Sequence, residues 1–162
     1  MVSNPPADLS LRPLTGQARS IEEWLTTFHL ASVVIDPYTV ESAWVLATAA
    51  RVLRSFRDAA VRVNFVVTAD DDDARAFLGP LADEFHVFVD PDRAAVKALG
   101  LDTLPAFVFV LEDGTVGASA EGWDARTWAR VADVIATTTS WSRPVLPVAG
   151  DPAPFAGSPA LG

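Results

Sequence analysis

The sequence has no cysteine among its 162 residues. This absence excludes disulfide bonds and every reaction that uses a thiolate of the chain itself, because the thiolate is the attacking form in such chemistry. Basic residues are scarce as well: 12 lysines and arginines stand against 21 aspartates and glutamates, for a formal net charge of −9. Because phosphate backbones are bound by basic surfaces, we expect no nucleic-acid partner. The acidic balance suits solubility or a basic segment of a partner protein.

Long hydrophobic runs are also missing. No stretch of the sequence approaches the roughly 18 apolar residues of a membrane-spanning helix, so we expect no membrane insertion. Residues 1–19 lack the apolar centre of a secretory signal, and we therefore expect a cytoplasmic protein.

Residues that bind metals or cofactors are too few or wrongly spaced. His29 and His86 are the only histidines, too few for a zinc site without cysteine. The acidic run 70–73 lacks the alternate spacing and the bidentate glutamate of a calcium loop, which predicts a solvated helix cap. No glycine-rich phosphate loop is present. We predict neither a metal nor a cofactor.

Hydrophobic periodicity predicts alternating helices and strands in a chain that is 50% hydrophobic. Helices are expected at 21–30, 39–56, 74–78, 93–99 and 125–137. Strands are expected at 32–36, 61–68, 85–90, 106–111 and 115–120. Ser20 and Glu23 form a capping box, and Asp124 caps the last helix. This order predicts an α/β fold with parallel strands and an antiparallel hairpin at one edge.

The helix at 39–56 is apolar almost throughout until Arg51. A helix that is apolar nearly all round is typical of a buried position, so we predict a central helix. Its small-residue face, which we expect to allow close packing, consists of Val40, Ala43, Trp44, Ala47 and Ala50.

The chain divides into a lead-in at 1–19, one domain at 20–138 and a tail at 139–162. The tail is rich in Pro, Ala and Gly: five of the 12 prolines lie in 141–162. Such a composition favours an extended conformation, and we predict neither helix nor sheet there.

The tripeptide Thr103-Leu104-Pro105, followed by a hydrophobic strand and an Asp113-Gly114 turn, resembles the cis-proline loop of thioredoxin-like proteins. The longer middle of the chain is similar to the peroxiredoxin and TlpA-type branches. The resemblance covers about 32–135. It implies a thioredoxin-like three-layer α/β/α fold with a mixed central sheet, and a cis bond before Pro105 that faces the turn at 37–42.

Relatives of this kind carry Cys-x-x-Cys at the turn into the central helix, where the resemblance places Ser42. Without cysteine, we expect no thiol oxidoreductase activity, and we assign no catalytic residue. The alternative is a non-thiol enzyme at the former redox site, with Glu41 or Asp36 as acid or base and Ser42 or Tyr38 as donor.

The resemblance implies a second property, in which the backbone before the cis-proline pairs with an extended peptide. We predict a non-catalytic binding protein: an accessory subunit, adaptor or chaperone. The sequence is weakly similar to cysteine-free thioredoxin-like accessory proteins of hydrogenase maturation. The predicted partner-binding residues are Pro37, Tyr38, Glu41, Ser42, Trp44, Thr103, Leu104, Pro105, Trp141 and Phe155.

The tail carries more apolar surface than a solvated segment needs. Its prolines lower the cost of ordering it on a surface. We therefore expect it to lie in extended form against a partner chain, with Trp141 and Phe155 as anchors.

Overall fold

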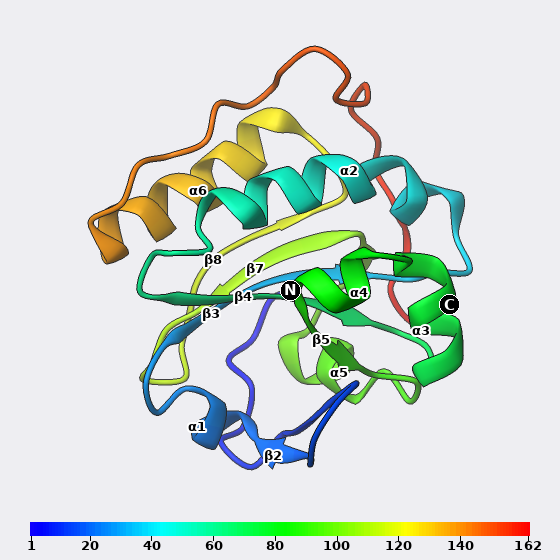
Figure 1. Ribbon diagram of the computed structural model, residues 1–162, viewed down its shortest axis with the longest axis vertical. Helices are drawn as coiled ribbons and strands as arrows, with labels where there is room; N and C mark the ends of the chain where they lie inside the picture. Colours follow the sequence, from blue (N-terminus) through cyan, green and yellow to red (C-terminus); the bar gives the residue numbers. More distant parts are fainter.

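A computed structural model describes residues 1–162 (Figure 1). The helices are α1 (Ile21–Trp24), α2 (Val40–Ser55), α3 (Asp71–Leu78), α4 (Leu81–Glu84), α5 (Ala94–Leu99) and α6 (Ala125–Thr139). The strands are β1 (Ser10–Pro13), β2 (Arg19–Ser20), β3 (His29–Ile35), β4 (Val61–Val67), β5 (His86–Val89), β6 (Thr103–Leu104), β7 (Ala106–Val110), β8 (Val116–Glu121) and β9 (Ser158–Pro159).

Seven strands form one sheet in the order β2-β1-β5-β4-β3-β7-β8, and β6 pairs separately with β9. Strands β3, β4 and β5 are parallel, whereas β7, β8 and β1 join antiparallel. Helices α2 and α6 cover one face of the sheet, and α1 and α5 lie on the other (Figure 1). The predicted three-layer arrangement with a mixed sheet is confirmed.

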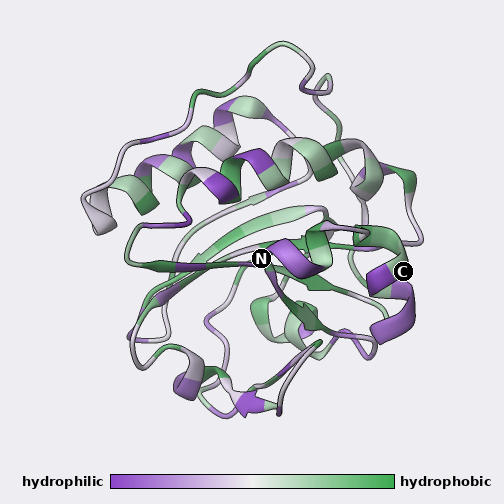
Figure 2. Cartoon of the chain, in the orientation of Figure 1, coloured by the Kyte–Doolittle hydropathy of each residue, from purple (hydrophilic) through white to green (hydrophobic).

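The central strands are buried on both faces, as parallel strands between two helical layers must be. One core, which includes Phe65 and Trp128, lies between the sheet and helices α2 and α6. The other, which includes Leu30 and Leu99, lies under α1 and α5. Figure 2 shows hydrophobic residues throughout the central strands. No helix is both long and apolar enough to cross a bilayer.

Local capping chemistry is as predicted. Ser20 accepts from the backbone N–H of Glu23, and Asp124 accepts from that of Arg126. The first helix is shorter than predicted, since α1 ends at Trp24. Strand β3 starts earlier, at His29, because its first residue already pairs with Val61 of β4.

Helix α2 is not buried all round, and this prediction was wrong. Val40 is 60% exposed and Trp44 56% exposed, and Ala43 and Ala47 are exposed too. The buried side consists of Ser42, Val45, Thr48, Ala49, Ala50, Val52 and Leu53. Only one face of α2 meets the sheet, so Ala43 and Ala47 on the other face remain exposed, whereas Ala50 is buried.

Both ends of the chain extend the fold. Residues 10–13, within the predicted lead-in, form β1 beside β5. The tail runs over the helical layer and returns along the far edge of the molecule (Figure 1). It forms strand β9, so the prediction that it contains no sheet was wrong at Ser158–Pro159. Its strand pairings are with its own domain, at Thr103–Leu104 and at Trp123.

Candidate functional site

The turn from β3 into α2 is closed by internal hydrogen bonds. Ser42, which the resemblance places near the redox position of thioredoxin-like proteins, is fully buried. Its Oγ accepts from the backbone N–H of Asp36 at 2.9 Å. Thr39 Oγ1 donates to the Asp36 carbonyl at 2.9 Å and lies 3.3 Å from Ser42 Oγ. The serine hydroxyl therefore holds the turn together and does not face solvent.

The carboxylate of Asp36 is 4% exposed and lies 2.9 Å from the guanidinium of Arg93. Its other oxygen accepts from the backbone N–H of Tyr38 at 3.0 Å. Arg93 stands in the left-handed region, with φ of 59°, just before α5. This conformation carries its side chain across to the turn at the end of β3. A buried carboxylate that pairs with an arginine and also accepts a backbone hydrogen bond is a structural element rather than a free base.

Three further predicted residues lie in this turn or in the first turn of α2 that follows it. Tyr38 is 64% exposed, and its hydroxyl donates to Asp73. That hydrogen bond is the main cause that raises the pKa of Tyr38 to about 12. Pro37 is half-buried, and Glu41, also half-buried, sits in the first turn of α2, where a helix dipole favours a negative charge.

The peptide bond between Leu104 and Pro105 is cis, as the sequence predicts. Leu104 is fully buried. The backbone of this loop is already paired, because Thr103 lies opposite Pro159 and Leu104 opposite Ser158. The tail of the chain thus occupies the backbone groups that we expected to bind a partner.

The tail also pairs with the segment that follows β8. Phe155 and Trp123 exchange two backbone hydrogen bonds, each 2.9 Å long. The indole of Trp123 donates to the carbonyl of Pro152 at 2.8 Å. The ring of Phe155 meets that of Trp44 edge to face, with 5.5 Å between centroids. Phe155 is therefore an anchor, but within its own chain.

Trp141 lies at the opposite end of α2. Its indole donates to the carbonyl of Ser55 at 2.9 Å. Between the two aromatic residues, Asp151 accepts from Thr48 at 2.8 Å and from Arg51 at 2.7 Å. Both Trp141 and Phe155 therefore contact the domain that precedes them, and their binding to a partner chain stays a prediction.

Sequence reasoning missed the residues that receive the tail. Arg93 donates to the carbonyl of Ala160 as well as to Asp36. Gly122 and Gly157 let the two backbones approach, since a Cβ on Gly122 would lie 2.4 Å from the Ala156 carbonyl oxygen. No local pattern identifies these positions, because their roles arise from contacts between distant parts of the chain.

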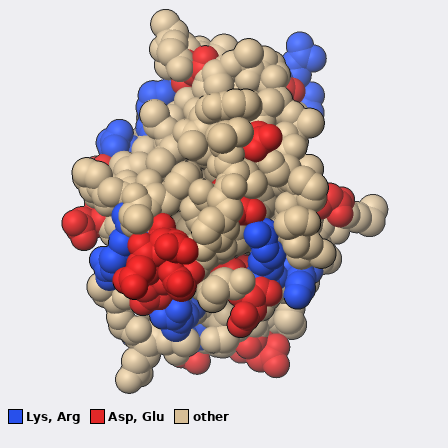
Figure 3. All heavy atoms as spheres, turned by 90° about the vertical axis from the view of Figure 1, so that its right-hand side faces the viewer, with Lys and Arg blue, Asp and Glu red and all other residues tan.

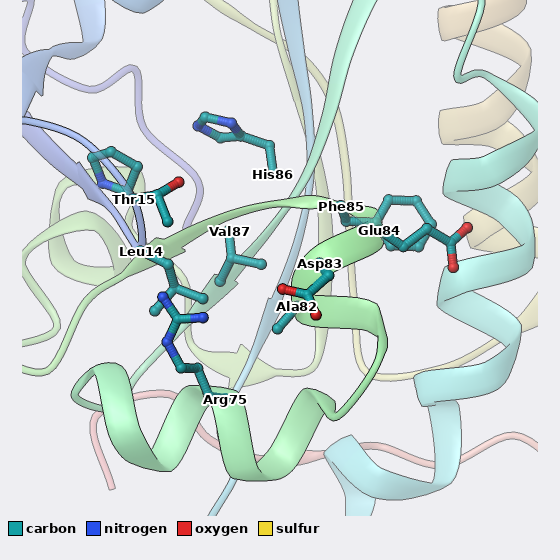
Figure 4. A pocket seen from close by; sticks show the side chains of 10 residues that line it. Leu14, Thr15, Arg75, Ala82, Asp83, Glu84, Phe85, His86 and Val87 are labelled. Carbon is teal, nitrogen blue, oxygen red and sulfur yellow. The ribbon is translucent and has the colours of Figure 1, made fainter.

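The cavities of the molecule do not include the turn from β3 into α2, although one of them is lined by the neighbouring Ala43. One cavity, of about 300 Å³, lies between the end of β1, α3 and the α4–β5 connection (Figure 4). Arg75 reaches into this space from α3, and Asp83 faces it from α4 (Figure 4). Neither this cavity nor the other four is lined by Asp36, Glu41 or Ser42. No group of three or more acidic or histidine side chains is placed to hold a metal ion.

The sheet order, the cis-proline loop and the helix that begins beside it define a thioredoxin-like fold. The site lacks the thiols that give such folds their redox chemistry, since the chain has no cysteine. No protein-family model matches this sequence, and no curated protein does.

Solved structures of redox proteins share the fold. A putative thioredoxin from Neisseria meningitidis is 17% identical, with a TM-score of 0.67 over 86% of this chain and 93% of its own. A secreted Mycobacterium tuberculosis disulfide oxidoreductase homologous to E. coli DsbE is 18% identical, with a TM-score of 0.63 over 81% and 96%. The Xanthomonas campestris bacterioferritin comigratory protein, which reduces alkyl peroxides, is 14% identical, with a TM-score of 0.64 over 88% and 98%.

Proposed function

We propose that this chain is a non-catalytic, cytoplasmic thioredoxin-like protein that acts by binding another protein, as an accessory subunit, adaptor or chaperone. One observation carries the proposal. The former redox position is sealed by the buried Ser42, while apolar side chains beside it, including Val40 and Trp44, are more than half exposed. Exposed apolar side chains grouped on one helix are typical of a protein interaction site.

We name this patch the α2 surface; it consists of Tyr38, Val40, Ala43, Trp44 and Ala47. It adjoins the acidic start of α3, because the Tyr38 hydroxyl bonds to Asp73. Figure 3, which shows the side of the molecule with α3 and the C-terminus, displays a compact acidic patch. Charge complementarity therefore favours a partner segment with an apolar anchor and flanking basic residues.

The narrower form of this proposal is an accessory role for a redox metalloenzyme such as a hydrogenase. It is supported by the weak sequence resemblance alone.

The alternative of a non-thiol enzyme has less support. A serine nucleophile needs an adjacent base, and the Oγ of Ser42 contacts only the backbone N–H of Asp36 and the hydroxyl of Thr39. The carboxylate of Asp36 is bound to Arg93. Catalytic carboxylates are typically found in a cleft with converging polar groups, and no cavity of the chain includes these residues.

Peptide display on the intact protein tests the proposal. Enriched peptides are expected to combine an aromatic or aliphatic residue with lysine or arginine, and their affinity should fall as salt rises. Val40→Asp should weaken binding of these peptides at least about tenfold, because it places a charge in the apolar centre. Val145→Asp, a change at a tail residue that is 70% exposed, is the matched control and should bind normally.

Two results would contradict the proposal. One is that no peptide is enriched above an unrelated thioredoxin-like protein. The other is that Val40→Asp binds the enriched peptides as tightly as the native chain does. Thiol reductase, peroxidase and hydrolase assays on the same preparation should match buffer, and activity that Ser42→Ala abolishes would favour the enzyme instead.

A further inference from the structure

The C-terminal segment lies in a groove of its own domain. The groove, which we name the tail groove, is formed by the backbone of Asp102–Leu104, by Trp123 and by Arg93. The N–H of Ala160 donates to the carbonyl of Asp102 at 2.9 Å, and Arg93 donates to the Ala160 carbonyl. Phe155 pairs with Trp123 further along. The whole contact is independent of the α2 surface except for the ring of Trp44.

The contacts are those of a bound peptide. The segment adds short antiparallel pairings to two backbone edges, at Thr103–Leu104 and at Trp123. In strand addition, main-chain hydrogen bonds supply affinity and a few side-chain positions supply selectivity. One ion pair is added at the start of the segment, where the carboxylate of Asp151 lies 2.7 Å from the guanidinium of Arg51.

The segment covers the domain and contributes one small side chain, that of Ala160, to the core under α1 and α5. In the tail, 141–162, Ala160 is the one residue that is buried, at 1% exposed. Trp141, Val145 and Leu161 are 41%, 70% and 59% exposed. Phe155 is partly buried and packs against the outside of the core between the sheet and helices α2 and α6. A segment held mainly by backbone hydrogen bonds can leave without opening the core beneath it.

Close approach makes the groove selective. A Cβ on Gly157 would lie 2.6 Å from the Leu104 carbonyl oxygen, and the residue has φ of 97°. Gly122 faces it, with its Cα 3.4 Å from that added Cβ. A ligand of this groove therefore needs glycine at this position, because any other residue meets both a backbone clash and an unfavourable φ.

We propose that the tail from Asp151 onward is an intramolecular ligand of the tail groove, which an extended segment of another protein replaces. The replacing segment shares the chemistry of the tail: an aromatic residue, glycine two positions later and a small residue three positions after that, as in Phe155, Gly157 and Ala160. Beside the groove, Arg51 of α2 pairs with Asp151 of the tail, so a segment with an acidic residue four positions before its aromatic residue fits best. The tail thereby limits access, since a tethered ligand is present at an effective concentration on the order of millimolar.

The first test uses the full chain with a protease recognition site inserted at the exposed Ala149–Gly150 junction. After cleavage, a fluorescent synthetic peptide of sequence 151–162 is added, and its anisotropy is recorded. The peptide is expected to exchange into the cut protein and to bind the uncut protein at least about tenfold more weakly, because the tethered tail competes. The peptide with Gly157→Val should lose at least about tenfold in affinity, whereas Ala156→Val, at an exposed neighbour, should bind normally.

The second test needs no cleavage. Hydrogen exchange on the intact chain should show the amides of Phe155 and Ala160 exchanging by local release, faster than those of strands β3 and β4. Exchange of these two amides only with global unfolding would overturn the proposal. So would a cut protein that unfolds when the tail is dialysed away, equal binding to cut and uncut chains, or no effect of Gly157→Val. Val40→Asp in the cut chain should leave peptide binding unchanged, which separates this proposal from that of the α2 surface.

Discussion

The buried carboxylate of Asp36 lies 2.9 Å from the guanidinium of Arg93. Asp36 directly follows β3, and Arg93 directly precedes α5. The ion pair therefore links the turn after β3 to the start of α5. The same guanidinium reaches the tail at Ala160. One side chain thus connects the turn after β3 to the C-terminal tail.

We expect Arg93→Met to destabilise the protein by about 3–5 kcal/mol, because it leaves the Asp36 charge buried without a partner. The double variant Asp36→Asn/Arg93→Met should be less destabilised than Arg93→Met alone, which urea unfolding can measure. The control is Arg143→Met, which removes an exposed ion pair with Asp133 and should change stability by less than about 1 kcal/mol. Equal losses in the two arginine variants would show that the Asp36 pair has no structural role.

Ser42→Ala should lower the free energy of unfolding by about 1–3 kcal/mol, because the backbone N–H of Asp36 then has no acceptor in a buried position. Thr138→Ala, on the exposed side of α6, is the matched loss of a hydroxyl and should change stability by about 0.5 kcal/mol or less. Peptide binding to the α2 surface should be unchanged in both. A stability loss for Ser42→Ala no larger than that for Thr138→Ala would contradict the hydrogen-bonded turn.

Tyr38 is the only tyrosine of the chain, so its ionisation can be followed alone by near-ultraviolet absorbance. The midpoint should lie at about 12, because the Tyr38 hydroxyl donates to Asp73, which raises its pKa. Asp73→Asn should bring the pKa of Tyr38 down toward the ordinary value near 10. Asp72→Asn, one residue away on the exposed start of α3, should leave it unchanged. An ordinary midpoint in the native chain, with circular dichroism showing it still folded, would rule out the hydrogen bond.

His86 should make the protein less stable as the pH falls. Burial, followed by the positive charge of Arg62, lowers the pKa of His86 below its ordinary 6.5. At pH well above 6.5 the imidazole is neutral in both states, so it does not affect stability. Below that pH the unfolded chain takes up the proton first and is favoured.

Thermal unfolding between pH 7 and pH 5 measures this effect. The native chain should lose more stability across this range than His86→Leu does. Parallel loss in the two proteins would show that the imidazole does not titrate differently on folding. The ring lies 4.7 Å from that of Phe88 and 5.1 Å from that of Trp24, which explains its low access to water.

Much of the fold could be predicted from local patterns. The strand at 61–68, the turn at Asp113-Gly114 and the cap at Asp124 depend on residues within a few positions of one another, and the structure has them where the sequence indicates. The cis bond at Pro105 followed from the resemblance and is confirmed. The exposure of Trp44 could not be predicted, because a helix that is apolar all round does not say which of its faces meets the sheet.

The sequence by itself determined that the chain has no thiol, that it alternates helices with strands, and that its C-terminus is extended. Composition and short-range hydrogen bonding decide these properties. Only the tertiary structure decided where the tail goes. Its contacts join residues far apart, such as Thr48 and Asp151, which are 103 positions apart. Pairings at that separation depend on Leu104, Trp123 and Arg93, which distant elements supply, and no local pattern can specify a groove that several distant elements build together.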